Sequence, residues 1–169
     1  MITPEQSQKF TRLHDRLTEV YNKKEMHRQS IYEFPKRIDE AMSEMKRALN
    51  KEQLYDKNNM AEKVFNDSRM QQLEAIMKDI NAFIHKFQGY LKVAAEVTYK
   101  NLEDLMHEMI TQHKVLSLPR TKPKEAFVIL KMLQGKIFAE EKSIQLSIDT
   151  FYKYTDELKE LQNRLRALH

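Results

Sequence analysis

Histidine is the residue type in this sequence that is best suited to metal coordination, and six are present. Asp104 and His107 stand three positions apart, which places a carboxylate and an imidazole on one face of a helix. A di-iron helical bundle needs two Glu-x-x-His pairs, and the sequence contains none. His107 and Glu108 begin like the zinc-protease motif His-Glu-x-x-His, but Thr111 occupies the second ligand position. The sequence therefore predicts no metal site.

The sequence also lacks the motifs of a catalytic nucleophile and of a phosphate-binding loop. There is no cysteine, no serine stands in a Gly-x-Ser-x-Gly turn, and the only two glycines are Gly89 and Gly135. Phosphate-binding loops need several clustered glycines so that backbone amides can approach the anion. Neighbouring acids such as Glu140 and Glu141 point about 100° apart on a helix and do not converge in a pocket. We therefore predict no catalytic residue, no cofactor and no enzymatic activity.

The composition favours a few long helices. With two glycines and four prolines, the sequence has too few turn-forming residues for a β-rich or α/β protein of 169 residues. Its abundant Lys, Leu, Glu, Met and Gln residues are good helix formers. The charged share of 32% suits helices that leave much of their surface in water. The sequence therefore predicts an all-α protein.

A first helix is predicted over about residues 4–50. Thr3 and Gln6 have the spacing of a capping box, and Pro4 fits the first helical position. Pro35 removes a backbone donor, so we expect a kink there, but the apolar spacing keeps its phase across it, which favours one continuous helix. The apolar stripe consists of Phe10, Leu13, Leu17, Val20, Ile31, Phe34, Ile38, Met42, Met45 and Leu49.

Polar side chains interrupt this stripe. Lys24 and His27 fall near the seam between Val20 and Ile31, where the apolar spacing weakens. His85 has a similar position beside the apolar stripe of the second helix. We interpret both histidines as residues at the edge of a helix seam and not as metal ligands.

Two further helices follow, over about residues 68–117 and 122–167. Residues 51–67 are predicted to be an irregular connection, because Asp56-Lys57-Asn58-Asn59 is typical of a loop. Two prolines fall in the loop 119–124, and Thr121 is predicted to cap the third helix. The apolar spacing of the third helix is close to the roughly 3.5-residue repeat of coiled coils. Its stripe consists of Phe127, Leu130, Leu133, Ile137, Ile144, Ile148, Phe151, Tyr154, Leu158, Leu161, Leu165 and Leu168.

These helices predict a single domain over residues 1–169. Short connections cannot return along helices of about 45 residues, so neighbouring helices should run up, down and up. The expected fold is an elongated antiparallel bundle of three long helices with coiled-coil-like packing. That arrangement places the N-terminus and the basic loop 119–124 at the same end.

Basic residues gather at that predicted end. The net charge is +4, and its surplus lies in the first segment and in the loop 119–124. These residues form a candidate tip for binding an anion or a protein partner, although Glu5, Asp15, Glu19 and Glu125 dilute its charge. The tip residues are Lys9, Arg12, Arg16, Arg120, Lys122 and Lys124.

Two functional interpretations follow from these patterns. The first is a non-catalytic structural or adaptor protein that docks a protein partner, or self-associates as a homo-oligomer, through helical surfaces in a larger assembly. The alternative is an anion-binding module whose basic tip holds nucleic acid or an acidic membrane. The sequence has no cysteine, no signal-peptide pattern and no apolar run near the ~20 residues that span a bilayer. We therefore expect a cytoplasmic protein without a transmembrane segment.

Overall fold

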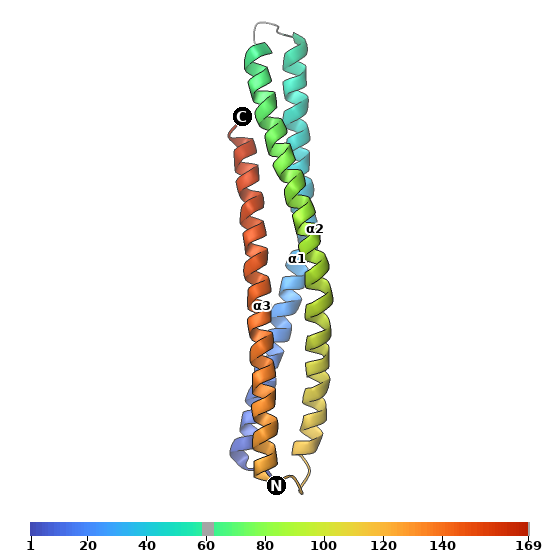
Figure 1. Ribbon diagram of the computed structural model, residues 1–169, viewed down its shortest axis with the longest axis vertical. Coiled ribbons are helices and arrows are strands. Elements are labelled where there is room, and N and C mark those ends of the chain that lie inside the picture. The colour runs from blue at the N-terminus through green and yellow to red at the C-terminus, as the bar shows by residue number, and fades with distance from the viewer. Residues whose placement is uncertain (59–62, 169) are drawn as a thin grey trace. The chain divides into compact units, whose positions relative to one another are not determined.

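The computed structural model describes the backbone over residues 1–58 and 63–168, and the side chains over residues 1–51, 68–92 and 101–168. Within these ranges the secondary structure is helical and contains no strand. Helix α1 spans Pro4–Asn58, α2 spans Lys63–Leu116 and α3 spans Pro123–Arg166 (Figure 1). The prediction of an all-α protein whose helices pack against one another is confirmed.

The helix ends agree with the sequence prediction except around residues 51–67. Helix α1 continues to Asn58 and α2 begins at Lys63, so the predicted irregular connection was too long. Residues 59–62 of that connection lie outside the described residues. The error has a physical cause: the polar residues Asp56, Lys57 and Asn58 lower helix propensity only slightly, so they did not end α1 at residue 50.

Pro35 lies inside α1, and the predicted continuity of the helix across it is confirmed. The ring is on the exposed side of the helix, while its neighbour Phe34 is buried. The helix therefore tolerates the missing backbone donor on the side where water can reach the unpaired carbonyl. The kink stays a prediction.

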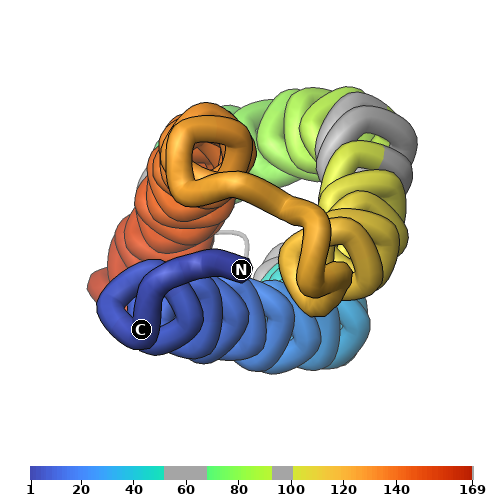
Figure 2. Tube along the Cα trace, turned by 90° about the horizontal axis from the view of Figure 1, so that it is seen from below, coloured from blue at the N-terminus to red at the C-terminus, as the bar shows by residue number. Residues whose placement is uncertain are grey.

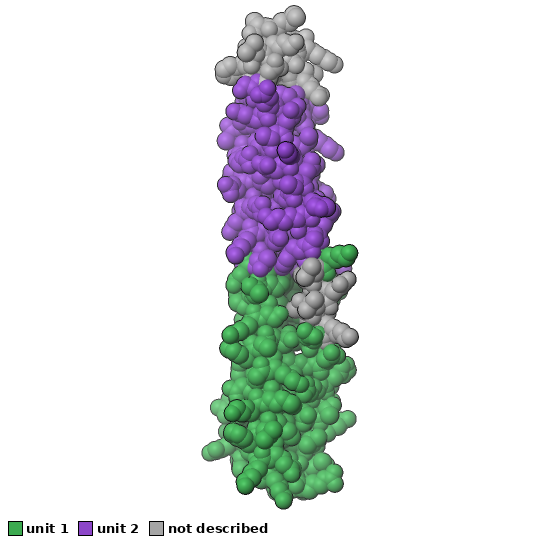
Figure 3. All heavy atoms as spheres, viewed as in Figure 1, with its two compact units in different colours: residues 1–29, 92–149 green, residues 30–91, 150–169 purple. Residues whose placement is uncertain are grey.

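The chain divides into two compact units, and each unit contains a segment of α1, a segment of α2 and a segment of α3 (Figure 3). Unit 1 consists of residues 1–29 and 92–149, and unit 2 consists of residues 30–91 and 150–169. Each unit has its own buried cluster of hydrophobic side chains. The single-domain prediction stays a prediction.

Aromatic side chains fill part of the core of unit 2. Phe34 is 1% exposed, and its ring centroid lies 4.6 Å from that of Phe87 and 5.3 Å from that of Phe151. Phe83 and Tyr154 extend the cluster, with 6.0 Å between their centroids. These separations are typical of rings in favourable tilted and edge-to-face contact.

Aliphatic side chains dominate the core of unit 1. This core joins buried residues of α1, α2 and α3 that stand three and four positions apart in sequence. Its members include Leu13, Leu17, Val20, Leu102, Leu105, Met109, Leu130, Leu133, Ile137 and Ile144.

The helix directions in unit 1 follow from hydrogen bonds at one end. The amino group of Met1 donates to the carbonyl oxygen of Pro119 at 2.7 Å, and the Gln6 amide donates to that of Pro123 at 2.8 Å. The start of α1 therefore lies beside the connection that leads from α2 into α3, as Figure 2 shows. Within unit 1, α2 runs antiparallel to α1 and α3.

Side chains complete the helix ends near this connection. Gln6 N–H donates to Thr3 Oγ1 at 3.1 Å and Thr3 N–H donates to Gln6 Oε1 at 3.0 Å, which confirms the capping box. The predicted capping of α3 by Thr121 was wrong. Its hydroxyl is buried and donates to the carbonyl oxygen of Val115 at 2.6 Å, so it closes the last turn of α2.

Candidate functional site

The predicted basic tip lies in unit 1. Arg12, Arg120, Lys122 and Lys124 are exposed, and Lys9 is half-buried. The bonds from Met1 and Gln6 bring the first turn of α1 against the loop that holds Arg120 and Lys122. The structure thus places the loop lysines and the N-terminal amino group at the same end of the unit.

Arg16 is separated from this end. It lies about 18 Å along α1 from Pro4 at ~1.5 Å per residue. Its half-buried guanidinium is paired with Glu141 of α3. A paired guanidinium has less capacity to bind an external anion, so Arg16 contributes least of the predicted residues. Anion binding at the tip stays a prediction.

A polar cluster is buried inside unit 1, where the apolar stripe of α1 weakens. Lys24 is 5% exposed and His27 is 8% exposed, and Glu140 of α3 is half-buried. His27 Nε2 and Ser147 Oγ are 3.0 Å apart. Burial lowers the pKa of Lys24, which the Glu140 charge opposes, and burial raises the pKa of Glu140, which Lys24 opposes. The cluster places opposite charges and a hydrogen bond where the apolar packing of α1 weakens.

The structure places neither His27 nor His85 at the edge of a helix seam, where the sequence predicted them. His27 lies within the core of unit 1, deeper than the seam edge. His85 is exposed on α2 in unit 2, farther out than the seam edge. Neither residue belongs to a group of three or more His, Cys, Asp or Glu side chains that could hold a metal within the described residues.

The buried position of His27 predicts a pH-dependent stability. Burial lowers its pKa below the ordinary value of 6.5. The unfolded chain therefore takes up the proton at a higher pH than the folded protein does. His27 contributes its full stability above about pH 6.5, and this contribution is lost as the pH falls through the folded-state pKa.

Urea unfolding at about pH 7.5 and about pH 5.5 checks this prediction. We expect the wild type to lose more unfolding free energy between these values than His27→Gln does. His107→Gln, at an exposed position on α2, is the matched control and should retain the wild-type difference. An equal pH dependence in wild type and His27→Gln would contradict the prediction.

The outward side of α3 in unit 1 carries a second apolar pattern. Residues three and four positions apart form one stripe, which we call the outer stripe: Val128, Lys131, Gly135, Phe138, Lys142 and Leu146. Its three large apolar side chains are between 52% and 70% exposed. Phe127 and Met132 flank the stripe and are also exposed.

Phe127 is a correction to the sequence prediction, which placed it in the core stripe. It is 58% exposed, and the neighbouring Ala126 is fully buried instead. Phe127 and Ala126 stand three and four positions before the buried Leu130, so the helical spacing allows either of them to be in the core. Packing of α3 against α1 and α2 buries Ala126. The bulky ring therefore lies on the surface.

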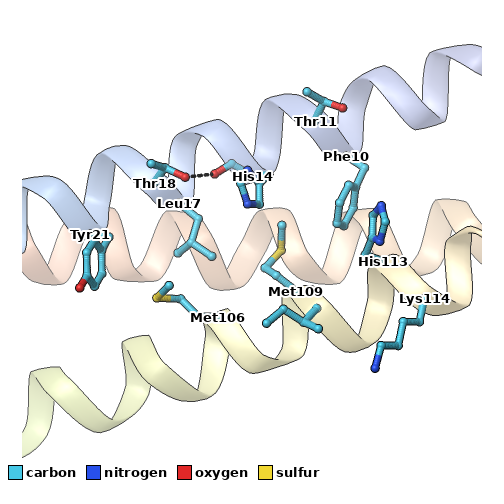
Figure 4. A pocket seen from close by; sticks show the side chains of 11 residues that line it. Phe10, Thr11, His14, Leu17, Thr18, Tyr21, Met106, Met109, His113 and Lys114 are labelled. Carbon is cyan, nitrogen blue, oxygen red and sulfur yellow. Dashed lines mark hydrogen bonds between the residues drawn. The ribbon is translucent and has the colours of Figure 1, made fainter.

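An apolar groove runs between α1 and α2 in unit 1, with a volume of about 560 Å³ (Figure 4). Leu17 and Tyr21 of α1 line it together with Met106, Met109 and Ile110 of α2. His113 lies toward one end, where the Phe10 and His113 ring centroids are 5.4 Å apart, and His14 lies between Phe10 and Leu17. Because Tyr21, Met106 and Ile110 are exposed by 38–58%, the groove is an apolar surface open to water.

Comparison of the chain with family models, with curated proteins and with solved structures found no match. Within its described residues, none of the helices combines the length and the apolar character needed to cross a bilayer. Any function must therefore be inferred from the surfaces that the structure describes.

Sequence reasoning predicted the tip, which stays a prediction, and missed the outer stripe and the groove. The signal for the outer stripe was present as the spacing 128-131-135-138-142-146, on the side of α3 away from its core stripe. The groove could not be found this way, because its residues come from two helices whose axial alignment only the fold supplies.

Proposed function

We propose that this chain is a non-catalytic structural or adaptor protein that docks a partner protein through helical surfaces in a larger assembly. The observation that carries the proposal is the outer stripe of α3 with its exposed flanks Phe127 and Met132. Single exposed apolar residues are normal on protein surfaces, but a row of them at helical spacing marks an interaction site. The chain's own core already uses the opposite side of α3.

The energetics support a role in docking. Fully burying a large apolar side chain stabilises by about 1.5–3 kcal/mol relative to leaving it in water. Five such side chains on one helix face remain exposed by 38–70% in the structure. A protein that covers them gains the part of this stabilisation that corresponds to their exposed surface, which the isolated unit leaves in water.

The proposal includes an architecture and a location. We propose that three long helices form one elongated antiparallel bundle with coiled-coil-like packing, which presents the outer stripe on a straight helix. The buried stripe of α3 repeats near 3.5 residues, which supports this packing. We also propose a cytoplasmic location, which the lack of cysteine supports.

Photo-crosslinking in the native cell tests the docking function. A benzophenone side chain at position 146 is expected to capture a discrete protein, and one at the exposed position 72 of α2 is not. Val128→Glu combined with Leu146→Glu should abolish a second crosslink placed at position 132, with unchanged helical content. If positions 146 and 72 give the same products, or neither gives any, the proposal fails.

An anion-binding tip is the second candidate function. It is favoured by the exposed Arg120, Lys122 and Lys124 beside the N-terminal amino group. Binding to nucleic acid or to anionic vesicles should then weaken steeply with salt and be lost when all three residues are changed to glutamate. Binding that is insensitive to salt, or absent at low ionic strength, would reject this candidate.

A further inference from the structure

We propose that the partner of the outer stripe is an acidic amphipathic helix, with two carboxylates about three turns apart that pair with Lys131 and Lys142. This inference rests on the proposed docking function and specifies the chemistry of its occupant. It is carried by the positions of the two lysines inside the apolar stripe. A purely apolar occupant would bury both ammonium groups without a counter-charge.

Neither lysine has a carboxylate one helical turn away on α3. The positions three and four residues away from Lys131 and Lys142 hold only Phe127, Val128, Gln134, Gly135, Phe138, Ala139, Gln145 and Leu146. Among the described residues, no ion pair includes either ammonium. By contrast, the neighbouring Lys136 is paired with Glu108 of α2 at 2.7 Å. The two lysines of the outer stripe therefore have no ion-pair partner among the described residues; Glu141, next to Lys142 in sequence, pairs with Arg16 instead.

Each ammonium lies over a ring of the apolar surface. Lys142 Nζ is 4.5 Å from the centroid of Phe138, and Lys131 Nζ is 5.9 Å from that of Phe127. These cation–π contacts hold the lysines along the surface, where an approaching carboxylate meets them. Residues 131 and 142 are separated by about 16 Å along the helix at ~1.5 Å per residue. Acids 11 positions apart on a partner helix have the same separation.

Gly135 lies between the two lysines on the outer stripe. A Cβ added there meets nothing within 4 Å, so the packing of unit 1 does not require a glycine. Inside a helix, glycine is less favourable than alanine. Its lack of a side chain gives a partner backbone room for close approach at the centre of the stripe.

The same charges argue against a second copy of this chain as the occupant. Face-to-face parallel packing sets each lysine against itself in the other copy. Antiparallel packing that places Val128 on Leu146 of the other copy brings Lys131 beside Lys142. Like charges in the middle of an interface oppose association.

A membrane surface fits the pattern less well than an acidic helix does. Helices that lie in a bilayer interface keep lysines on the polar face and present an uncharged apolar face to the lipid. Here the lysines alternate with apolar residues along a single stripe. Carboxylates at defined positions satisfy this pattern better than a uniform layer of headgroups.

Designed helical peptides test the inference with the full-length protein. Three peptides share one leucine stripe and carry Glu, Gln or Lys at two positions 11 residues apart. We expect the Glu peptide to bind about tenfold more tightly than the Gln peptide, with the Lys peptide weakest. Lys131→Glu combined with Lys142→Glu should reverse this order. The matched control, Lys46→Glu with Lys78→Glu on other surfaces, should keep it.

Glycine variants provide an independent measurement. Gly135→Leu should weaken binding of the Glu peptide, whereas Gly89→Leu, at another open helical position, should not. Circular dichroism and urea unfolding confirm that both variants fold. Equal binding by the two variants would overturn the assigned position of the partner helix.

Other outcomes separate this inference from the docking function. If all three peptides bind equally well to the wild type, the carboxylate inference fails and apolar docking stands. Dimerisation that Leu146→Lys abolishes, or lysine-dependent binding to phosphatidylserine vesicles without peptide binding, identifies a different occupant and overturns the inference. If peptides, vesicles and self-association all give no signal, and position 146 gives no crosslink, the docking function itself is rejected.

Discussion

Phe34→Ala is expected to lower the free energy of unfolding by about 3–5 kcal/mol. The side chain is 1% exposed and packs against Phe83, Phe87 and Phe151, which come from α2 and α3. Its removal leaves a cavity between three helices and also breaks several ring contacts worth about 0.5–1.5 kcal/mol each. Urea unfolding, followed through the helical circular dichroism signal at about 222 nm, measures the loss of unfolding free energy.

Two companion variants control this measurement. Glu33→Ala changes the exposed neighbour of Phe34 on the same helix and should alter stability by less than about 0.5 kcal/mol. Phe34→Leu loses the same ring contacts but keeps part of the buried volume, so it should cost less than Phe34→Ala. A loss below about 1 kcal/mol for Phe34→Ala would mean that the cluster collapses into the space, contrary to close packing between three helices.

The fold class could be predicted from sequence because helix formation here is a local property. Few turn-forming residues and apolar spacings of three and four are enough to predict long amphipathic helices. Strong local signals also located their ends, such as the Thr3–Gln6 capping box and the prolines near α3. Asp56 and Asn58 misled the prediction because polar residues lower helix propensity only slightly, and the helix continues through them.

The exposed apolar surfaces were harder to predict because they depend on which faces the other helices cover. Helix α3 has two apolar faces in unit 1, and its sequence alone does not say that Ala126 is buried and Phe127 exposed. The basic tip shows the same limit. Charge and topology place Lys122 near the start of α1, but the pairing of Arg16 with Glu141 depends on the axial alignment of α1 and α3.

The buried polar cluster was visible in sequence only as a weakness of the α1 stripe. Lys24 and His27 marked the place, and the structure supplies Glu140 and Ser147 from α3. Apolar residues at these positions would bury more apolar surface. A polar layer inside a helical bundle commonly selects the alignment of the helices at a cost in stability. This interpretation leads to a second prediction with a large effect.

Glu140→Leu is expected to destabilise the protein by about 3 kcal/mol, because it leaves the ammonium of Lys24 buried without its main counter-charge. Burial lowers the pKa of Lys24, and the negative charge of Glu140 opposes this lowering more than the charges of Glu103 and Glu25 do. Lys24→Met should cost less. The carboxylate of Glu140 is only half-buried, so it can reach water or take up a proton.

The double variant Lys24→Met with Glu140→Leu tests two roles for these charges. They either stabilise the fold or only select the alignment of the helices. Replacing both charges by apolar groups removes the desolvation cost, so we expect a stability equal to wild type or about 1 kcal/mol higher. Urea unfolding of the four proteins measures the interaction between the two sites. If Glu140→Leu alone is as stable as wild type, Lys24 does not depend on Glu140. A double variant clearly less stable than wild type, with a non-zero interaction between the two sites, would instead show that the opposite charges stabilise the core, because charges that only set the helix alignment can be replaced without loss.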